Sequence, residues 1–213
     1  MQKSDIVLLI MNCYNYIDKA EKQRNTWLKS LPINITYFHV IGDKIKCGEQ
    51  QFVFDNKNNI LFVASEDDYN SLPHKVIESF GAINKTYEYK YILKTDDDQM
   101  LIKPNFFFEF QKLILSSNSN YHYGGTPVSV KDHISMYHLI HDCLPKDLLL
   151  KQTVYCNGRF YFLSKEANQN ILKSKHLIKE HFIEDHSIGL YLDDVYKGGN
   201  MLCFDSKKIF CDT

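Results

Sequence analysis

The chain has 213 residues, 44% of them hydrophobic and 14% aromatic, which is enough to bury the core of one domain. Its formal net charge is −1 and its 25 basic residues are spread along the chain, so nucleic acid is not an expected partner. No apolar run approaches the roughly 18 residues of a membrane span, and no signal-peptide cleavage site follows the N-terminus. We expect a single domain over residues 1–213, located in the cytoplasm.

The first half of the chain alternates between apolar runs and segments with helical spacing. Short apolar runs of this kind are typical of strands that are covered on both faces. The predicted strands are residues 5–11, 35–41, 60–64 and a strand that begins at residue 91, and the predicted helices are residues 16–31 and 70–85. This order predicts an α/β sheet that is sandwiched by helices.

The second half has a less regular pattern. Residues 129–153, which we call the excursion, have no clean period, and long excursions in compact domains tend to be functional loops or lids. Their histidines have unequal spacing, which favours a solvated surface over a metal site. Around the excursion we predict helices at residues 104–115 and 165–174 and part of another helix at residues 188–192. The predicted strands are residues 121–128, 159–163, 201–204 and 208–211.

Three consecutive aspartates, Asp96, Asp97 and Asp98, follow the strand that begins at residue 91. If the strand continues to Asp98, Asp96 and Asp98 point to one side and Asp97 to the other. Two converging carboxylates raise each other's pKa unless a cation compensates them, and Mg²⁺ and Mn²⁺ prefer oxygen ligands. Ligands bind at the carboxyl ends of strands in open α/β sheets. The pattern therefore indicates a metal site, with a solvated turn as the alternative.

Five segments follow one another in an order that resembles a known family. They are RNTW (24–27), EDDYNSLPHK (66–75), YILKTDDD (91–98), YCNGRFYFLS (155–164) and IEDHSIG (183–189). Together they resemble glycosyltransferase family 31, the β-1,3-galactosyltransferases and Fringe-type enzymes. The resemblance implies a GT-A fold with a central, mostly parallel sheet flanked by helices. It also implies a UDP-sugar donor and Mn²⁺, or Mg²⁺, as the metal.

The same resemblance implies a role for each matching position. It implies that Asp98 binds the metal directly, with Asp96 beside it, and that Asp185 is the catalytic base. The residues that it places at the nucleotide are Arg24, Lys75, Asp96, Asp97 and Gly158. No histidine follows His186, so a histidine ligand near the C-terminus, which is common in such enzymes, is not available here.

Three of these positions also have a plainer interpretation. Lys75 has the helical spacing for an ion pair with Glu78. Gly158 fits a turn before a strand as well as a close approach of backbone to a ligand. Asp185, with its charged neighbours, fits an ordinary helix start.

The expected activity is metal-dependent, inverting transfer of a hexose or N-acetylhexosamine from a UDP-sugar to an acceptor hydroxyl. The resemblance implies a β-1,3 linkage on a glycan or glycoprotein, with residues 1–103 as the nucleotide-sugar half and residues 104–213 as the acceptor half. The alternatives are an Mg²⁺-dependent phosphoryl-transfer enzyme or hydrolase, and a non-catalytic nucleotide-sugar-binding module. We expect a minimal form of viral or microbial origin, and therefore a microbial or host cytoplasm.

Overall fold

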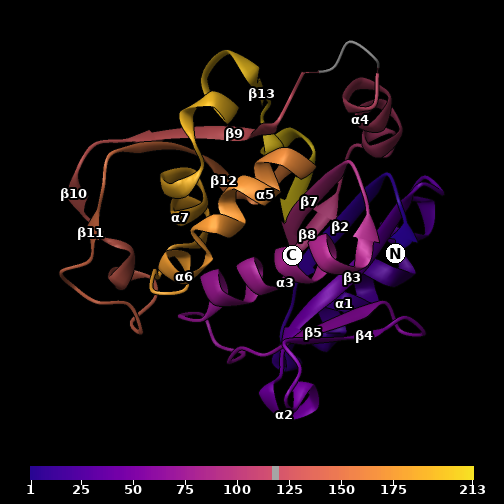
Figure 1. Cartoon of the computed structure of the whole chain (residues 1–213), viewed down its shortest axis with the longest axis horizontal. Helices are drawn as coiled ribbons and strands as arrows, with labels where there is room; N and C mark the ends of the chain where they lie inside the picture. Colours follow the sequence, from indigo (N-terminus) through magenta and orange to yellow (C-terminus); the bar gives the residue numbers. More distant parts are fainter. Residues whose placement is uncertain (117–119) are drawn as a thin grey trace.

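An eight-stranded mixed sheet forms the centre of the structure, a computed structural model that describes residues 1–116 and 120–213 (Figure 1). Four of its seven strand pairings are parallel and three are antiparallel. This arrangement confirms the predicted α/β fold. In spatial order the strands are β13 (Met201–Cys203), β9 (Tyr123–Val130), β12 (Thr153–Ser164), β7 (Tyr91–Asp96), β2 (Ile6–Met11), β3 (Ile35–Gly42), β5 (Ile60–Val63) and β4 (Phe52–Asp55).

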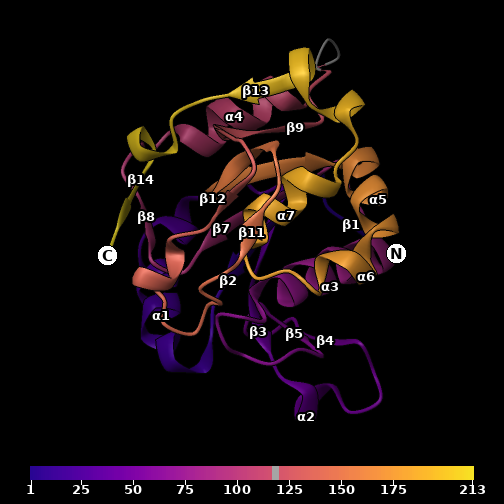
Figure 2. The same cartoon turned by 90° about the vertical axis from the view of Figure 1, so that its left-hand side faces the viewer.

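Helices cover both faces of this sheet, with α3 and α4 on opposite sides (Figure 2). A hydrophobic core lies on each face of the sheet. Strand β2 contributes to both cores, because successive side chains alternate between the two faces of a strand. Val7 belongs to the same core cluster as Phe80 of α3, and Leu8 belongs to the cluster that contains Trp27 and, on α4, Phe107. The helices are α1 (Ile17–Asn25), α2 (Lys44–Cys47), α3 (Leu72–Thr86), α4 (Phe106–Ile114), α5 (Lys165–Lys173), α6 (Lys175–Ile178) and α7 (Glu184–Tyr191).

Three short strand pairs lie outside the large sheet. They are β1 (Gln2–Lys3) with β6 (Tyr87–Glu88), β8 (Gln99–Leu101) with β14 (Phe210–Asp212), and β10 (His133–Ile134) with β11 (Leu149–Leu150). The last pair belongs to the excursion, which continues from β9 and β12 at the left of Figure 1. Short 3-10 helices are at Tyr14–Tyr16, Trp27–Ser30, Tyr137–Leu139, Asp194–Tyr196, Gly198–Asn200 and Ser206–Lys208.

The structure differs from the sequence predictions in several places, and the strand predicted at residues 159–163 is the longer β12. The helix predicted over residues 16–31 ends at Asn25, because Thr26 has a non-helical backbone (φ −117°, ψ −108°). The segment Trp27–Ser30 then forms a separate 3-10 turn whose Trp27 ring stacks on Phe107. Strand β4 was not predicted, since its four residues are only partly buried at the edge of the sheet. Among the described residues, no helix combines the length and the apolar character needed to cross a bilayer.

Candidate active site

A cleft of about 760 Å³ opens where β2 and β7 end, at the carboxyl edge of the sheet. Its lining contains six of the seven predicted site residues, all except Arg24: Lys75, Asp96, Asp97, Asp98, Gly158 and Asp185. A second cavity, of about 510 Å³, lies at the opposite ends of the same strands and contains none of them. The cleft at the carboxyl edge is therefore the candidate active site.

The aspartates form a turn, and the prediction that the strand continues through Asp98 was wrong. Strand β7 ends at Asp96 because its neighbour β2 ends at Met11, whose carbonyl accepts a hydrogen bond from the Asp97 N–H (3.0 Å). The chain then leaves the large sheet, and β8 pairs with β14 instead. As a result all three side chains line the cleft, including Asp97, which strand alternation placed on the far side.

A buried lysine lies beneath the aspartate turn. Lys94 is only 1% exposed, and its Nζ lies 2.7 Å from Asp96 Oδ1 and 3.1 Å from Glu184 Oε2. It also donates to the carbonyl of Gly158 (2.8 Å), and the Tyr161 hydroxyl donates to Glu184. Burial alone would lower the pKa of Lys94, but the two carboxylates outweigh it and raise that pKa. We call Lys94, Asp96, Glu184 and the adjacent Asp185 the Lys94 cluster.

Asp185 lies in the first turn of α7, where helix geometry favours a carboxylate. Its Oδ2 accepts a hydrogen bond from the Gly158 N–H (2.7 Å), and its Oδ1 accepts one from the His186 N–H (2.7 Å). Burial raises the pKa of Asp185, and the Lys94 charge partly offsets this. A Cβ at Gly158 would lie 3.3 Å from Asp185 Oδ2 and 3.4 Å from Lys94 Nζ, so a larger residue here would crowd the carboxylate and the ammonium group.

The other two aspartates have different partners. Asp97 Oδ2 accepts from Asn12 Nδ2 (2.9 Å), while its Oδ1 lies 3.9 Å from Lys19 Nζ. Burial raises the pKa of Asp97 to about 7, against the opposing charge of Lys19. Asp98 Oδ1 accepts from Gln99 Nε2 (2.7 Å), which also donates to Asp212 Oδ1 (2.8 Å). The sequence analysis missed Asp212, because only the β8–β14 pairing brings this carboxylate beside the turn.

Lys75 is buried on α3 and reaches into the cleft lining. Its Nζ donates to the Asn12 carbonyl (2.9 Å) and to Asp67 Oδ1 (2.6 Å). The alternative pairing of Lys75 with Glu78 was wrong, since Glu78 contacts Lys175 and other cations instead. Lys75 therefore links α3 to the loop that follows β2.

Arg24 does not line the cleft. Its guanidinium lies near His39. Burial and the charge of Arg24 lower the pKa of His39 to about 3. The adjacent Gln23, which the sequence analysis did not single out, does reach the aspartate turn. Its Nε2 donates to the carbonyls of Asp96 (3.1 Å) and Gln99 (2.9 Å), and its Oε1 accepts from His39 Nε2 (3.0 Å). Gln23 thus fixes the backbone of the turn from α1.

The cleft has an excess of acidic side chains. Seven carboxylates and four cationic side chains line it, so an anionic nucleotide would be repelled unless a cation accompanied it. Within residues 1–116 and 120–213, no three His, Cys, Asp or Glu side chains gather as a complete metal site. Asp98 and Asp96 nevertheless fit Mn²⁺ or Mg²⁺, which proteins often bind through one or two carboxylates, with substrate phosphates and water as the other ligands.

Comparison with known proteins identifies the family of the chain. The sequence profile of the galactosyltransferase family matches residues 19–196, which is most of the chain. The protein belongs to the galactosyltransferase family. It is a glycosyltransferase, and its resemblance to glycosyltransferase family 31 is confirmed. No curated protein sequence matches the chain.

Two solved glycosyltransferases have a similar fold. One is involved in glycosylation of the major capsid of PBCV-1, with a TM-score of 0.53, 14% identity, and coverage of 94% of this chain and 82% of that one. The other is the galactosyltransferase LgtC in complex with donor and acceptor sugar analogues, with a TM-score of 0.50, 11% identity, and coverage of 94% and 74%. These similarities confirm the predicted GT-A fold of this galactosyltransferase-family member.

Proposed function

We propose that this family member transfers a hexose or an N-acetylhexosamine from a UDP-sugar to an acceptor hydroxyl, with inversion at the anomeric carbon. The observation that carries the proposal is the position of Asp185 on the same cleft as Asp96, Asp97 and Asp98. Such a transfer needs a base for the acceptor and a means of neutralising the leaving diphosphate. The cleft offers candidates for both.

In the proposed step, the acceptor oxygen attacks the anomeric carbon and its proton passes to Asp185. The bond between the anomeric carbon and the diphosphate oxygen breaks, and UDP leaves with the electron pair. A single displacement of this kind inverts the anomeric centre. The Gly158 and His186 N–H groups orient the carboxylate, and burial raises its pKa toward a range suited to a general base.

Asp98 and Asp96 would hold Mn²⁺ or Mg²⁺, which when bound neutralises charge on the leaving diphosphate. Residues 1–103, which carry these aspartates, Asp97 and Lys75, would bind the nucleotide. Residues 104–213, which carry Asp185, would face a glycan or glycoprotein acceptor. The β-1,3 linkage is proposed from the family resemblance.

Family membership favours this function over the two alternatives, phosphoryl transfer or hydrolysis and nucleotide-sugar binding without catalysis. An intact, oriented Asp185 also favours catalysis over simple binding. The alternatives make different predictions, since phosphoryl transfer or hydrolysis would consume phosphate esters without a sugar donor.

The test measures UDP release from UDP-galactose, UDP-glucose and UDP-N-acetylglucosamine, with methyl β-glycosides as acceptors, in Mn²⁺ or in EDTA. We expect Asp185→Asn to lower transfer roughly 10²- to 10⁴-fold, the usual contribution of a general base. Asp98→Ala should abolish the Mn²⁺ dependence together with most of the activity.

The matched control is Asp194→Asn, because Asp194 is 97% exposed and lies outside the cleft lining. This variant should retain wild-type turnover. Metal-independent turnover, or full activity in both cleft variants, would overturn the proposed mechanism.

A further inference from the structure

Aromatic side chains line part of the cleft, and the proposed chemical step does not use them. Tyr69 and His141 stack with ring centroids 4.0 Å apart and planes 17° from parallel, and Tyr137 belongs to the same lining. Tyr69 is 39% exposed and Tyr137 is 42% exposed. Because Tyr69 precedes α3 while His141 and Tyr137 belong to the excursion, the stack joins the two halves of the chain across the cleft.

The excursion is anchored next to the candidate base. Leu144 and Leu150 of the excursion are buried against Ile183, which directly precedes α7 and lies two residues before Asp185. The β10–β11 pairing closes the excursion on itself, and Asn70 Nδ2 donates to the Cys143 carbonyl (3.2 Å). The aromatic side chains therefore have a defined position relative to Asp185.

The chemistry of this surface suits a neutral sugar ring. Aromatic faces carry negative charge density, which attracts the C–H groups on one face of a pyranose. The Tyr69 hydroxyl is protonated at neutral pH and can donate to a sugar oxygen, and burial, with a contribution from the Asp185 carboxylate, raises its pKa further, to about 12. Asn157 and Asp185, in the same lining, offer polar partners for the hydroxyls at the edge of such a ring.

We propose that Tyr69, Tyr137 and His141 form the subsite for the acceptor sugar, holding a pyranose with one hydroxyl directed toward Asp185. This inference rests on the proposed function, because it takes Asp185 as the base. It assigns the acceptor to the excursion side of the cleft and leaves the aspartate turn for the nucleotide. It also explains why exposed aromatic residues lie beside a carboxylate.

The test is saturation-transfer NMR with the methyl β-glycosides of galactose, glucose and N-acetylglucosamine. At least one of the three should bind the wild-type protein. Tyr137→Ala should weaken that binding about three- to tenfold, the equivalent of one aromatic contact. Tyr137→Phe keeps the ring and should bind within about twofold of wild type.

Leu139→Ala is the matched control, since Leu139 lies in the same 3-10 helix, is 70% exposed and is outside the cleft lining. It should leave glycoside binding unchanged, and UDP affinity measured by calorimetry should be unchanged in all variants. Equal glycoside binding by wild type and Tyr137→Ala would overturn the subsite. So would the absence of any glycoside binding by a protein that binds UDP, whereas failure to bind UDP as well would overturn the proposed function.

Discussion

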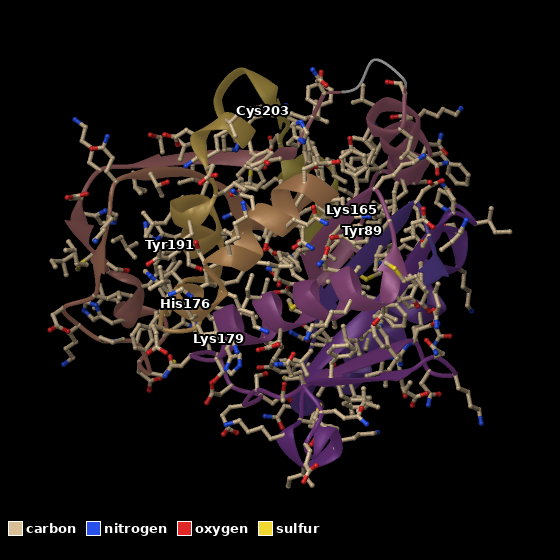
Figure 3. All side chains as sticks on the ribbon, in the orientation of Figure 1. Tyr89, Lys165, His176, Lys179, Tyr191 and Cys203 are labelled. Atoms are coloured by element: carbon tan, nitrogen blue, oxygen red, sulfur yellow. The ribbon has the colours of Figure 1, made fainter. Side chains whose placement is uncertain are left out.

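Two clusters of buried charge, one around Lys94 and one around Glu78, have opposite charge balance. Glu78 of α3 is contacted by Lys175 (2.7 Å), by Lys179 and by His74 (3.7 Å). Lys179, labelled in Figure 3, lies near the place where α6 approaches α3. Burial alone would raise the pKa of Glu78, but these neighbours outweigh burial and lower the pKa to about 2. We call Glu78, His74, Lys175 and Lys179 the Glu78 cluster. Its two lysines more than compensate the charge of its single carboxylate.

The Lys94 cluster has one cation and several carboxylates. Burial raises the pKa of Asp96 to about 6, although Lys94 opposes the shift, and burial raises the pKa of Glu184 and Asp185 as well. These groups face a cleft, while the Glu78 cluster fastens α3 to α6. The Glu78 cluster, whose buried charge is compensated, stabilises the fold. An excess of like charge that faces a cleft, as in the Lys94 cluster, is typical of a functional site.

Removing the cation from the Lys94 cluster should have the largest effect. Lys94→Met leaves Asp96 and Glu184 facing each other with no positive charge between them, which should cost about 3–5 kcal/mol of unfolding free energy. Chemical denaturation measures this loss. The double variant Lys94→Met, Glu184→Gln should recover part of it, and no recovery would show that repulsion between the carboxylates is not the cause.

Crowding the same cluster should mainly affect catalysis. The added methyl group in Gly158→Ala meets Asp185 Oδ2 and Lys94 Nζ at 3.3–3.4 Å, so the carboxylate must move slightly. We expect kcat to fall, but by less than the roughly 10²-fold that a 1 Å misplacement of a reacting group can cost. Gly199→Ala is the control, because nothing lies within 4 Å of a Cβ there. Equal kcat values in the two variants would contradict the assigned role of Gly158.

Disrupting the Glu78 cluster should have the smallest effect and leave activity intact. Glu78→Gln removes the carboxylate, but Lys175 and Lys179 are about a quarter exposed, so water replaces much of the lost interaction. We expect a loss of about 1–2 kcal/mol at neutral pH. UDP release should equal that of the wild type. A large loss of turnover would show that the Glu78 cluster is needed for activity as well as for the fold.

The pH dependence of that variant follows from the direction of the pKa shift. The folded-state pKa of Glu78 is depressed from 4.5 to about 2, so its stabilisation is present above pH 4.5 and is lost as the pH falls toward 2. The stability difference between wild type and Glu78→Gln should therefore shrink across this window. Denaturation at several pH values checks this, and a constant difference would contradict it.

Much of the fold could be predicted because its strands are apolar runs with few polar interruptions. The predicted strand at residues 5–11 became β2, and residues 70–85 became α3, within two residues at each boundary. The end of β7 could not be placed, because it depends on where the neighbouring strand stops and not on the aspartates themselves. Strand β4 lacked a clear apolar signal because it lies at the edge of the sheet.

The site residues that belong to a sequence motif could be predicted. The contacts that form only where distant segments of the chain meet could not. Asp185 and the aspartates were found by resemblance, whereas the contact of Lys94 with Glu184 joins residues 90 positions apart. One signal was available, since Lys94 and Asp96 are two residues apart on a strand and so share a face. Gln23 and Asp212 gave no local signal, because each acts through contacts made by the folded chain.

The excess negative charge of the cleft should be matched by a donor that binds together with a cation. Thermal unfolding with UDP alone, with Mn²⁺ alone and with both tests it most directly, since ligands that bind only the folded state raise its stability. UDP and Mn²⁺ together should raise the unfolding temperature by more than the sum of their separate effects. This excess should be lost in Asp98→Asn and kept in Asp194→Asn. A UDP-induced shift of the same size in EDTA, or in Asp98→Asn, would contradict the claim.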